Sequence, residues 1–478
     1  IGLDSSGIVS GVYQLVIQGI NDEGVAIASK NVEMRRPEPP AWLTQKHGTR
    51  NFVPEPYTPV QASAETVRIW NREYRLADDS FLPRQIMSGG EPLFAGAPRV
   101  VMTVDGSEAV LKGDAELVET NPEFAVYRWT GKAGSVPVRA DVRVEFDGFM
   151  TMDVEADTAD RTVEKLFVEF PLRDRNASLY SLAHYYNQQR GIDIQPYSHG
   201  LPQSGVTGKG FHIGFNHGVW LGSESRGMQW CAETAEFWRN ADRGRAIEVT
   251  PENGVTTLRL RVIDTPTRLP RLTYRWGVAV GPVRPYEGAS NGLYVLQRNY
   301  GKGGKLGKWG DVGKRLNANW MIVHQQWNRD FAHGQPFREI PGIEERAHLA
   351  AAMKAHGMDS VFYAGWTGMS PVMEMWPYYG EAMRRVPTRF TGGSYKPCTR
   401  GGFIQYMANG VVWMYENIGC KGVFLDGTAG PEPCKNPYHG CGFGDPETGR
   451  PIVTRDIWGR RELFKRMYKI LNGEVMEN

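Results

Sequence analysis

Hydrophobic and polar residues alternate with a period of two over most of residues 66–285. Around the turn-forming pair Asp147-Gly148, apolar side chains occupy every second position of residues 142–146 and again of residues 150–154. This alternation is typical of strands with one buried face, and an Asp-Gly pair favours the tight turn of a hairpin. Many such strands with few helical stretches predict a large antiparallel β-sandwich.

Two strand-like stretches precede this region. Residues 12–17 and 25–32 flank the turn-forming residues 21–24, and a Pro-rich linker follows them. Two strands alone are hardly stable, so we expect them to close a larger sheet. We therefore expect residues 1–40 to hold the C-terminal hairpin of an incomplete β-sandwich and a linker, and residues 41–290 to form the large sandwich.

The period of the pattern changes after residue 309. Short apolar runs, typical of buried parallel strands, alternate there with stretches of helical periodicity. The runs cover residues 319–325, 360–365 and 422–426, and the helical stretches cover residues 343–356, 403–418 and 456–471. This alternation predicts that residues 291–478 form the N-terminal part of a catalytic-type (β/α)8 barrel. Because such a barrel needs about 250 residues, and because the N-terminal hairpin lacks the rest of its sheet, we expect the chain to be truncated at both ends.

Composition narrows the classes of function. The 478 residues include 55 Lys and Arg against 53 Asp and Glu, a net charge of +2, which argues against a protein that neutralises many nucleic-acid phosphates. No apolar run approaches the roughly 20 residues of a membrane span. The 14 Trp residues suit a core of β-sheets or platforms for flat ligands such as sugars and bases.

The strongest signal of a functional site is GVFLDGT at residues 422–428, where an apolar strand ends in Asp426. Function in parallel α/β folds gathers at the carboxyl ends of strands, and a carboxylate there can act as general acid, general base or nucleophile. The alternative is that Asp426 only caps its turn. A structureless loop as long as the one expected to follow, up to Thr454, is usually functional, so we predict that Asp426 is catalytic.

This loop contains Cys434, Tyr438, His439 and Cys441. Three interpretations of the cysteines stay open: a disulfide that closes the loop, two free thiols, or a metal site shared with His439. The spacing matches none of the paired Cys-x-x-Cys patterns and a fourth ligand is not evident, so we predict no bound metal and no cofactor. Tyr438 and His439 are predicted to bind a polar substrate.

Aromatic, amide and acidic residues follow the first two strands of the expected barrel. Trp327 and Asn328 follow the first strand, and Tyr363, Trp366 and Glu374 lie at and beyond the end of the second. A sugar site needs a flat apolar face for the ring and hydrogen-bond partners for its hydroxyls. We predict that Trp327, Asn328, Tyr363 and Trp366 bind the substrate and that Glu374 is the second catalytic carboxylate. The alternative role for the aromatic side chains is packing.

Two weaker signals favour structural roles. The Gly- and Lys-rich residues 301–313 fit no phosphate-binding motif, so a flexible linker is expected there. In the segment WCAE, Glu233 follows Trp230 and Cys231 at the end of a predicted strand. Its carboxylate could reach the barrel, but a core strand that ends in an exposed acid is the favoured interpretation.

The order of these segments resembles a known family. The chain is similar to an uncharacterised bacterial family related to glycoside hydrolase family 123. The similarity lies in a sandwich over residues 51–285, followed by a barrel that contains GVFLDGT, CxNxxHGCG from Cys434 and an Arg-rich helix around Arg460. The resemblance covers nearly the whole chain and is most specific over residues 422–442. It implies a secreted or periplasmic carbohydrate-active protein with N-terminal β-sandwich domains and a C-terminal catalytic barrel.

The resemblance also bears on the chemistry. Family-123 enzymes use an adjacent Asp-Glu pair at a barrel strand end, with the substrate's acetamido group as nucleophile, whereas here Asp426 is followed by Gly427. The resemblance places further barrel strands after Asn478. We therefore predict a glycoside hydrolase that acts on a bacterial, plant or host glycan by carboxylate acid-base chemistry. The alternatives are a non-catalytic carbohydrate-binding protein and a metal-dependent hydrolase that uses residues 434–441.

Overall fold

The structure is a computed structural model, and the chain in it divides into two compact units. The first unit comprises residues 1–48, 293–426 and 462–471, and the second comprises residues 49–292, 427–461 and 472–478. The structure describes residues 8–77, 79–183, 204–284, 293–297, 306–323, 343–364, 368–369, 371, 373, 375–386, 395–425, 431–445 and 449–474.

Antiparallel sheets dominate the described part of the second unit. The largest has the strand order β10-β11-β12-β13-β23-β19-β18-β15-β16. Its strands are β10 (Leu111–Asn121), β11 (Phe124–Ala133), β12 (Val136–Glu145), β13 (Met150–Asp157), β15 (Leu179–Leu182), β16 (Ser204–Val206), β18 (Gly218–Gly222), β19 (Gly227–Ala232) and β23 (Arg271–Gly281).

Two further sheets complete the sheet structure of the described residues from 49 to 284. The second sheet has the order β17-β20-β21-β14-β8-β9, with β22 beside β14, and the third has the order β3-β4-β5-β6-β7. The second sheet contains β8 (Arg99–Val104), β9 (Ser107–Ala109), β14 (Thr162–Arg173), β17 (Phe211–Ile213), β20 (Ile247–Glu252), β21 (Val255–Ile263) and β22 (Thr267–Arg268). The third contains β3 (Gln61–Ala62), β4 (Thr66–Ile69), β5 (Arg72–Arg75), β6 (Gln85–Ser88) and β7 (Glu91–Pro92).

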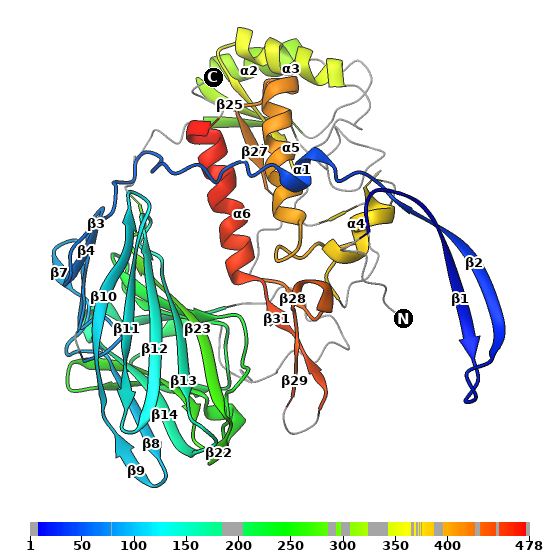
Figure 1. Ribbon diagram of the computed structural model, residues 1–478. Coiled ribbons are helices and arrows are strands. Elements are labelled where there is room, and N and C mark those ends of the chain that lie inside the picture. The colour runs from blue at the N-terminus through cyan, green and yellow to red at the C-terminus, as the bar shows by residue number, and fades with distance from the viewer. Residues whose placement is uncertain are drawn as a thin grey trace. The chain divides into compact units, whose positions relative to one another are not determined.

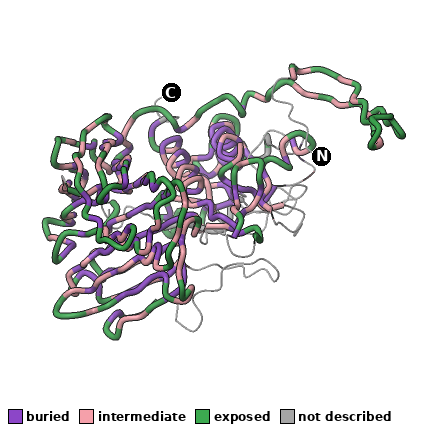
Figure 2. Tube along the Cα trace, turned by 60° about the horizontal axis from the view of Figure 1, so that its bottom comes forward, coloured by how far each residue is buried: buried purple, intermediate pink, exposed green. Residues whose placement is uncertain are grey.

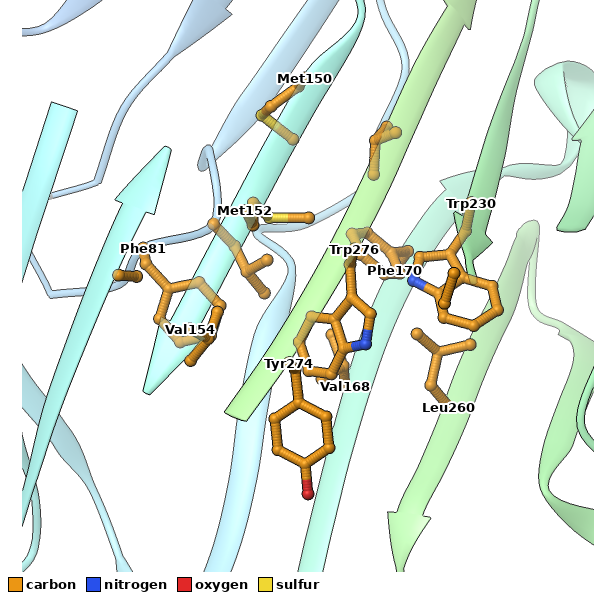
Figure 3. Packing of buried hydrophobic residues seen from close by; sticks show 14 of the residues in the cluster. Phe81, Met150, Met152, Val154, Val168, Phe170, Trp230, Leu260, Tyr274 and Trp276 are labelled. Carbon is orange, nitrogen blue, oxygen red and sulfur yellow. The ribbon is translucent and has the colours of Figure 1, made fainter. Parts of the chain in front are cut away.

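All three sheets contribute to one hydrophobic core. Figure 3 shows Met152 and Trp276 of the largest sheet together with Val168, Phe170 and Leu260 of the second sheet. Side chains on successive residues of a strand point to opposite faces, so alternation along each strand places one apolar row in this core. Burying these rows is the main force that holds the two sheets together.

The predicted hairpin around Asp147-Gly148 is confirmed. Strands β12 and β13 pair antiparallel, with Val142 opposite Met152 and Val144 opposite Met150. All four of these side chains are buried. The period-two alternation therefore set both the strands and their register, because a shift of one residue would turn the apolar row away from the core.

The first unit contains a parallel sheet with the strand order β24-β25-β26-β27. Its strands are β24 (Leu293–Gln297), β25 (Ala318–Val323), β26 (Asp359–Tyr363) and β27 (Gly422–Phe424). In the part of the chain that the structure describes, the α-helices are α1 (Ala41–Thr44), α2 (Leu306–Arg315), α3 (Ile343–Ala355), α4 (Trp376–Met383), α5 (Phe403–Ile418) and α6 (Ile457–Lys469), which continues into a π-helical turn at Ile470–Glu474. Short 3-10 helices lie at Asp174–Asn176, Arg243–Arg245 and Pro437–His439.

Helices α3 and α5 pack on the parallel sheet. Leu349 and Met353 of α3 share a hydrophobic cluster with Met414 of α5 and with Met321 and Phe362 of the sheet. Glycines close both helices: Gly357 and Gly419 follow them with φ values of 77° and 76°, a conformation that favours glycine. The predicted alternation of strand and helix is therefore present over these residues.

The linker expected at residues 301–313 is a wrong prediction over its second half, because α2 begins at Leu306. Its Gly310 lies against the turn that follows α3: a Cβ atom at this position would come within 2.6 Å of the His356 ring. Glycine costs helix stability in isolation, but here it allows a close contact that a larger residue would block. Tertiary packing overrides the local preference for a loop.

The two N-terminal strands pair as predicted. Strands β1 (Gly11–Ile20) and β2 (Ala26–Arg36) form an antiparallel ribbon in which Leu15 lies opposite Val32. Most of this ribbon is exposed (Figure 2). Among the described residues we find no helix with the length and apolar character needed to cross a membrane.

Candidate functional site

The carboxyl ends of three neighbouring parallel strands meet at one edge of the sheet. Strands β25 and β26 pair through Val323 and Phe362, and β26 and β27 pair through Tyr363 and Phe424. The amide of Ala364 extends this pairing by donating a hydrogen bond of 3.0 Å to the Phe424 carbonyl. Ligand sites of parallel α/β folds gather at such an edge.

Most of the predicted site residues follow these strands in the sequence. Asp426, Glu374, Trp327, Asn328 and Trp366 all lie outside the described residues, so their roles stay predictions.

Tyr363 is described and deeply buried. Its side chain is 3% exposed and its ring centroid lies 5.9 Å from that of Phe424. Because side chains alternate along a strand, Tyr363 and Phe424 share one face of the sheet, opposite to the neighbouring Phe362. Packing therefore accounts for the observed position of Tyr363, and its role in substrate binding stays a prediction.

A cavity in the first unit has a volume of about 930 Å³. Helix α1 lies beside α5 there (Figure 1), and the Trp42 ring of α1 meets the rings of Tyr379 and Tyr406 edge-on at 5.3 and 5.5 Å. Trp413 and Glu416 of α5 also line this cavity. Aromatic faces beside polar and acidic groups are the ingredients of a sugar-binding surface.

The loop after β27 is more ordered than we predicted. Its described residues form two antiparallel pairs, one between β28 (Pro433–Cys434) and β31 (Thr454–Arg455), the other between β29 (Phe443–Gly444) and β30 (Pro451–Ile452). The expectation of a structureless loop is therefore wrong over these residues. Turn residues between the pairs bring distant parts of the loop together.

Cys434, His439 and Cys441 meet inside this loop. Their possible ligand atoms lie within 4.8 Å of one another, and His439 Nδ1 is 3.1 Å from Cys441 Sγ. Both cysteines are buried and neither is part of a disulfide, so the disulfide interpretation is not what the structure contains. The side chain of Tyr438, by contrast, is 71% exposed. The structure thus separates two neighbours that the sequence had grouped as substrate-binding residues.

Glu233 corrects another expectation, because its side chain is only 2% exposed. Its Oε1 accepts a hydrogen bond of 2.8 Å from the backbone amide of Trp458, in the first turn of α6. Its backbone carbonyl accepts a second bond of 2.8 Å from the Arg455 amide. An acid at a helix N-terminus satisfies a free amide and complements the helix dipole, so Glu233 anchors the end of the loop to the β19 strand.

Arg461 adds an ionic anchor within the same unit. Its guanidinium lies 2.9 Å from Glu145 and 2.8 Å from Asp147, and its carbon Cζ stands 4.5 Å from the Phe149 ring centroid. Burial disfavours the charge of Arg461, but the Asp147 and Glu145 carboxylates outweigh that effect and raise its pKa above the ordinary value. The guanidinium therefore stays charged and bridges α6 to the β12–β13 hairpin.

Sequence reasoning missed three parts of these arrangements. These are the helix cap at Glu233, the ion pairs of Arg461 and the aromatic cavity at Trp42. Each of them brings together residues that are more than 200 positions apart in the sequence. A signal did exist for Asn436: Asn followed by Pro437 favours a turn, and its side chain accepts a hydrogen bond of 3.1 Å from the Tyr438 amide.

Comparisons with known proteins give structural neighbours but no family. No family model matches the chain, and no curated protein matches it. Among solved structures, the alpha-galactosidase from Lactobacillus brevis shares 9% identity at a TM-score of 0.39, covering 98% of this chain and 68% of that one. The GH36 alpha-galactosidase AgaB from Geobacillus stearothermophilus shares 9% identity at a TM-score of 0.40, covering 87% and 67%.

A third neighbour is a variant of the GH36 alpha-galactosidase AgaA from Geobacillus stearothermophilus, in complex with raffinose. It shares 11% identity at a TM-score of 0.38, and the match covers 98% of this chain and 70% of that one. These solved structures are all glycoside hydrolases. Likeness at this level assigns neither a family nor an activity to the chain.

Proposed function

We propose that the chain is part of a glycoside hydrolase whose active site lies at the carboxyl edge of the parallel sheet. In this proposal the two largest sheets of the second unit are the layers of a β-sandwich, and the β24–β27 sheet belongs to a (β/α)8 barrel. The protein acts in the periplasm or outside the cell, as the resemblance to the family-123 relatives implies.

One observation carries the proposal. Strands β25, β26 and β27 are parallel neighbours that end at Val323, Tyr363 and Phe424. The candidate residues Asn328 and Asp426 lie a few positions beyond two of these ends in the sequence. Segments that leave adjacent parallel strands emerge at the same edge, which is where the catalytic residues of barrels are found.

The chemistry needs two carboxyl groups. Asp426 supplies the first and Glu374 the second: one protonates the glycosidic oxygen, while the other attacks the anomeric carbon or activates a water. A separation of about 5 Å between the two carboxyl groups gives retention, and about 6.5 to 9.5 Å gives inversion. Trp327, Asn328 and Trp366 would hold the sugar ring and its hydroxyls in this scheme.

Sugar release from a panel of glycosides tests the proposal. The panel contains nitrophenyl α- and β-glycosides of galactose, glucose and N-acetylhexosamines, with raffinose included because one structural neighbour binds it. We expect at least one member to be hydrolysed above the level of a heat-denatured sample. Absence of release from every member, with the protein folded, would contradict the proposal for these sugar classes.

A non-catalytic carbohydrate-binding protein is the second candidate, and the cavity at Trp42 favours it. Trp413 is only partly buried beside Glu416, so its indole is accessible to a ligand in the cavity. In this case Trp413→Ala would weaken the binding of a sugar oligomer in calorimetry by about 1 kcal/mol or more, because the loss of a stacked aromatic ring costs roughly this amount. Hydrolysis by the wild type would count against this candidate as the sole function.

A further inference from the structure

We propose that Cys434, His439 and Cys441 bind a zinc ion that holds the loop between β28 and β31 in its folded shape. This inference does not rest on the proposed function. It concerns a structural site, whose loss would change the loop before it changed any chemistry at the sheet edge.

The three side chains have the geometry and the chemistry that zinc requires. Zinc binds thiolate sulfur at about 2.3 Å and imidazole nitrogen at about 2.0 to 2.1 Å in tetrahedral sites, which places sulfur and nitrogen about 3.6 Å apart and two sulfurs about 3.8 Å apart. The ligand atoms here lie within 4.8 Å of one another, so small side-chain rotations bring them to those distances. Two soft thiolates with an imidazole favour zinc over magnesium or calcium, which prefer oxygen ligands.

The backbone around the site is built to direct these ligands. The Asn436 amide donates a hydrogen bond of 3.4 Å to Cys434 Sγ, and the Cys441 amide donates one of 3.2 Å to the Asn436 carbonyl. Gly440 and Gly442 have φ values of 66° and 87°, which turn the chain sharply on both sides of Cys441. Amide donors to sulfur stabilise a thiolate, and such outer contacts orient metal ligands in known sites.

Burial also points to a metal ion. Cys434 is 1% exposed and Cys441 is 6% exposed. His439 Nε2 is buried and has no hydrogen-bond partner within the part of the chain that the structure describes. A buried polar atom without a partner costs about 1 to 3 kcal/mol, and a metal ion bound at Nε2 removes that cost.

The burial of both cysteines favours a structural role over a catalytic one. Catalytic zinc keeps an open position for water or substrate, whereas structural zinc is enclosed by its ligands. One coordination position remains for a fourth donor beyond these three side chains. In this arrangement His439 serves the metal and does not contact substrate, while the exposed Tyr438 remains free for that role.

Metal analysis of the purified protein is the first test. We expect one zinc per chain by elemental analysis, and after removal with a chelator we expect Zn²⁺ to rebind and Co²⁺ to give the intense visible absorption of tetrahedral thiolate coordination. Binding of zinc releases thiol protons, so its affinity should fall as the pH is lowered.

Variants locate the site. Cys434→Ser and His439→Ala should weaken zinc binding by at least about a hundredfold, since even outer contacts of a metal site contribute 10 to 100-fold. His439→Cys should retain the metal, because a thiolate can replace the imidazole. The matched control is Cys231→Ser, which alters a buried cysteine of strand β19 in the same unit and should leave the zinc content unchanged.

Each of the following results would overturn the proposal. The first is a wild-type protein that contains no zinc and binds neither Zn²⁺ nor Co²⁺ after full reduction. The second is intact mass spectrometry without reductant that shows a Cys434–Cys441 disulfide in the native protein. If the variants fail to fold, limited proteolysis of the wild type with and without chelator still tests the proposal. A protease should cut residues 431–456 faster after zinc removal, and equal rates would contradict the proposal. Glycosidase activity can fail in the panel above while zinc binding persists, so the two proposals fail separately.

Discussion

Replacing Arg461 with methionine should destabilise the protein strongly, although the residue lies on the first helical turns after a loop. Its guanidinium lies 2.9 Å from Glu145 and 2.8 Å from Asp147. The Arg461 and Glu145 side chains are 20% and 9% exposed. Methionine keeps the apolar stem of the side chain and removes the guanidinium, with its charge, its hydrogen bonds and its contact with the Phe149 ring.

The expected magnitude follows from the burial of the partners. Removing one member of a buried ion pair costs about 3 to 5 kcal/mol, because the remaining charge is left uncompensated. Two features place Arg461 at the lower end: Asp147 is 27% exposed, and Arg143 still lies 3.2 Å from Glu145. We therefore expect a loss of about 3 kcal/mol, which corresponds to a drop of roughly 3 °C in the unfolding midpoint for a chain of 478 residues.

Thermal unfolding of Arg461→Met beside the control Arg275→Met measures this effect. Arg275 also pairs with an aspartate, Asp153, but the two side chains are 56% and 44% exposed. An exposed pair contributes at most about 1 kcal/mol, so the control should lose little. Equal losses in the two variants would refute the reasoning. A double-mutant cycle with Asp147→Asn should also give a coupling energy well above zero.

Two further predictions concern the pH dependence and a helix end. Burial, together with the nearby Arg455 charge, lowers the pKa of His217 from 6.5 to about 3, so the folded state keeps the ring neutral. The stability from this residue is complete above pH 6.5 and is lost as the pH falls towards 3, at up to about 1.4 kcal/mol per pH unit. The loss of unfolding free energy between pH 7 and pH 5 should therefore be about 2 kcal/mol smaller in His217→Gln than in the wild type. Equal losses in the two proteins would contradict the lowered pKa of His217. Gly419→Ala should lower the free energy of unfolding in urea by about 1 kcal/mol, because φ is 76° at this position. The control Gly96→Ala, at an exposed glycine, should be neutral or stabilising. An unchanged stability of Gly419→Ala would be inconsistent with the left-handed helix end.

The spacing of apolar residues and the turn residues beside them were enough to predict elements in which both signals agree. The β12–β13 hairpin and the α5 helix with Gly419 at its end combine apolar periodicity with a residue suited to the turn. In both cases the short-range preference agrees with the burial that the fold imposes. Helix α2 shows the opposite, since the fit of Gly310 against His356 depends on a partner that the local sequence does not reveal.

The residues of the candidate site could likewise be predicted only in part. The sequence identified Cys434, His439 and Cys441, but the spacing alone left three interpretations open. Their convergence depends on the turn at Asn436 and on the left-handed Gly440, which no periodic pattern reports. Contacts such as Glu233 with Trp458 join positions 225 residues apart, so only the folded chain could reveal them.

The substitution Asp426→Asn tests the central claim most directly, because it keeps the shape of the side chain and removes its titrating group. The matched control is Asp359→Asn. Asp359 begins β26 at the opposite edge of the same sheet and pairs there with Lys354 at 3.2 Å.

The measurement is kcat/KM for the glycoside that the panel identifies, with thermal unfolding of each variant as the check on folding. A general acid or base contributes typically 10² to 10⁴ in rate, so we expect Asp426→Asn to lose at least about a hundredfold while Asp359→Asn stays near the wild type. A loss of less than about tenfold in Asp426→Asn, with unchanged stability, would contradict the assignment of catalysis to this edge of the sheet.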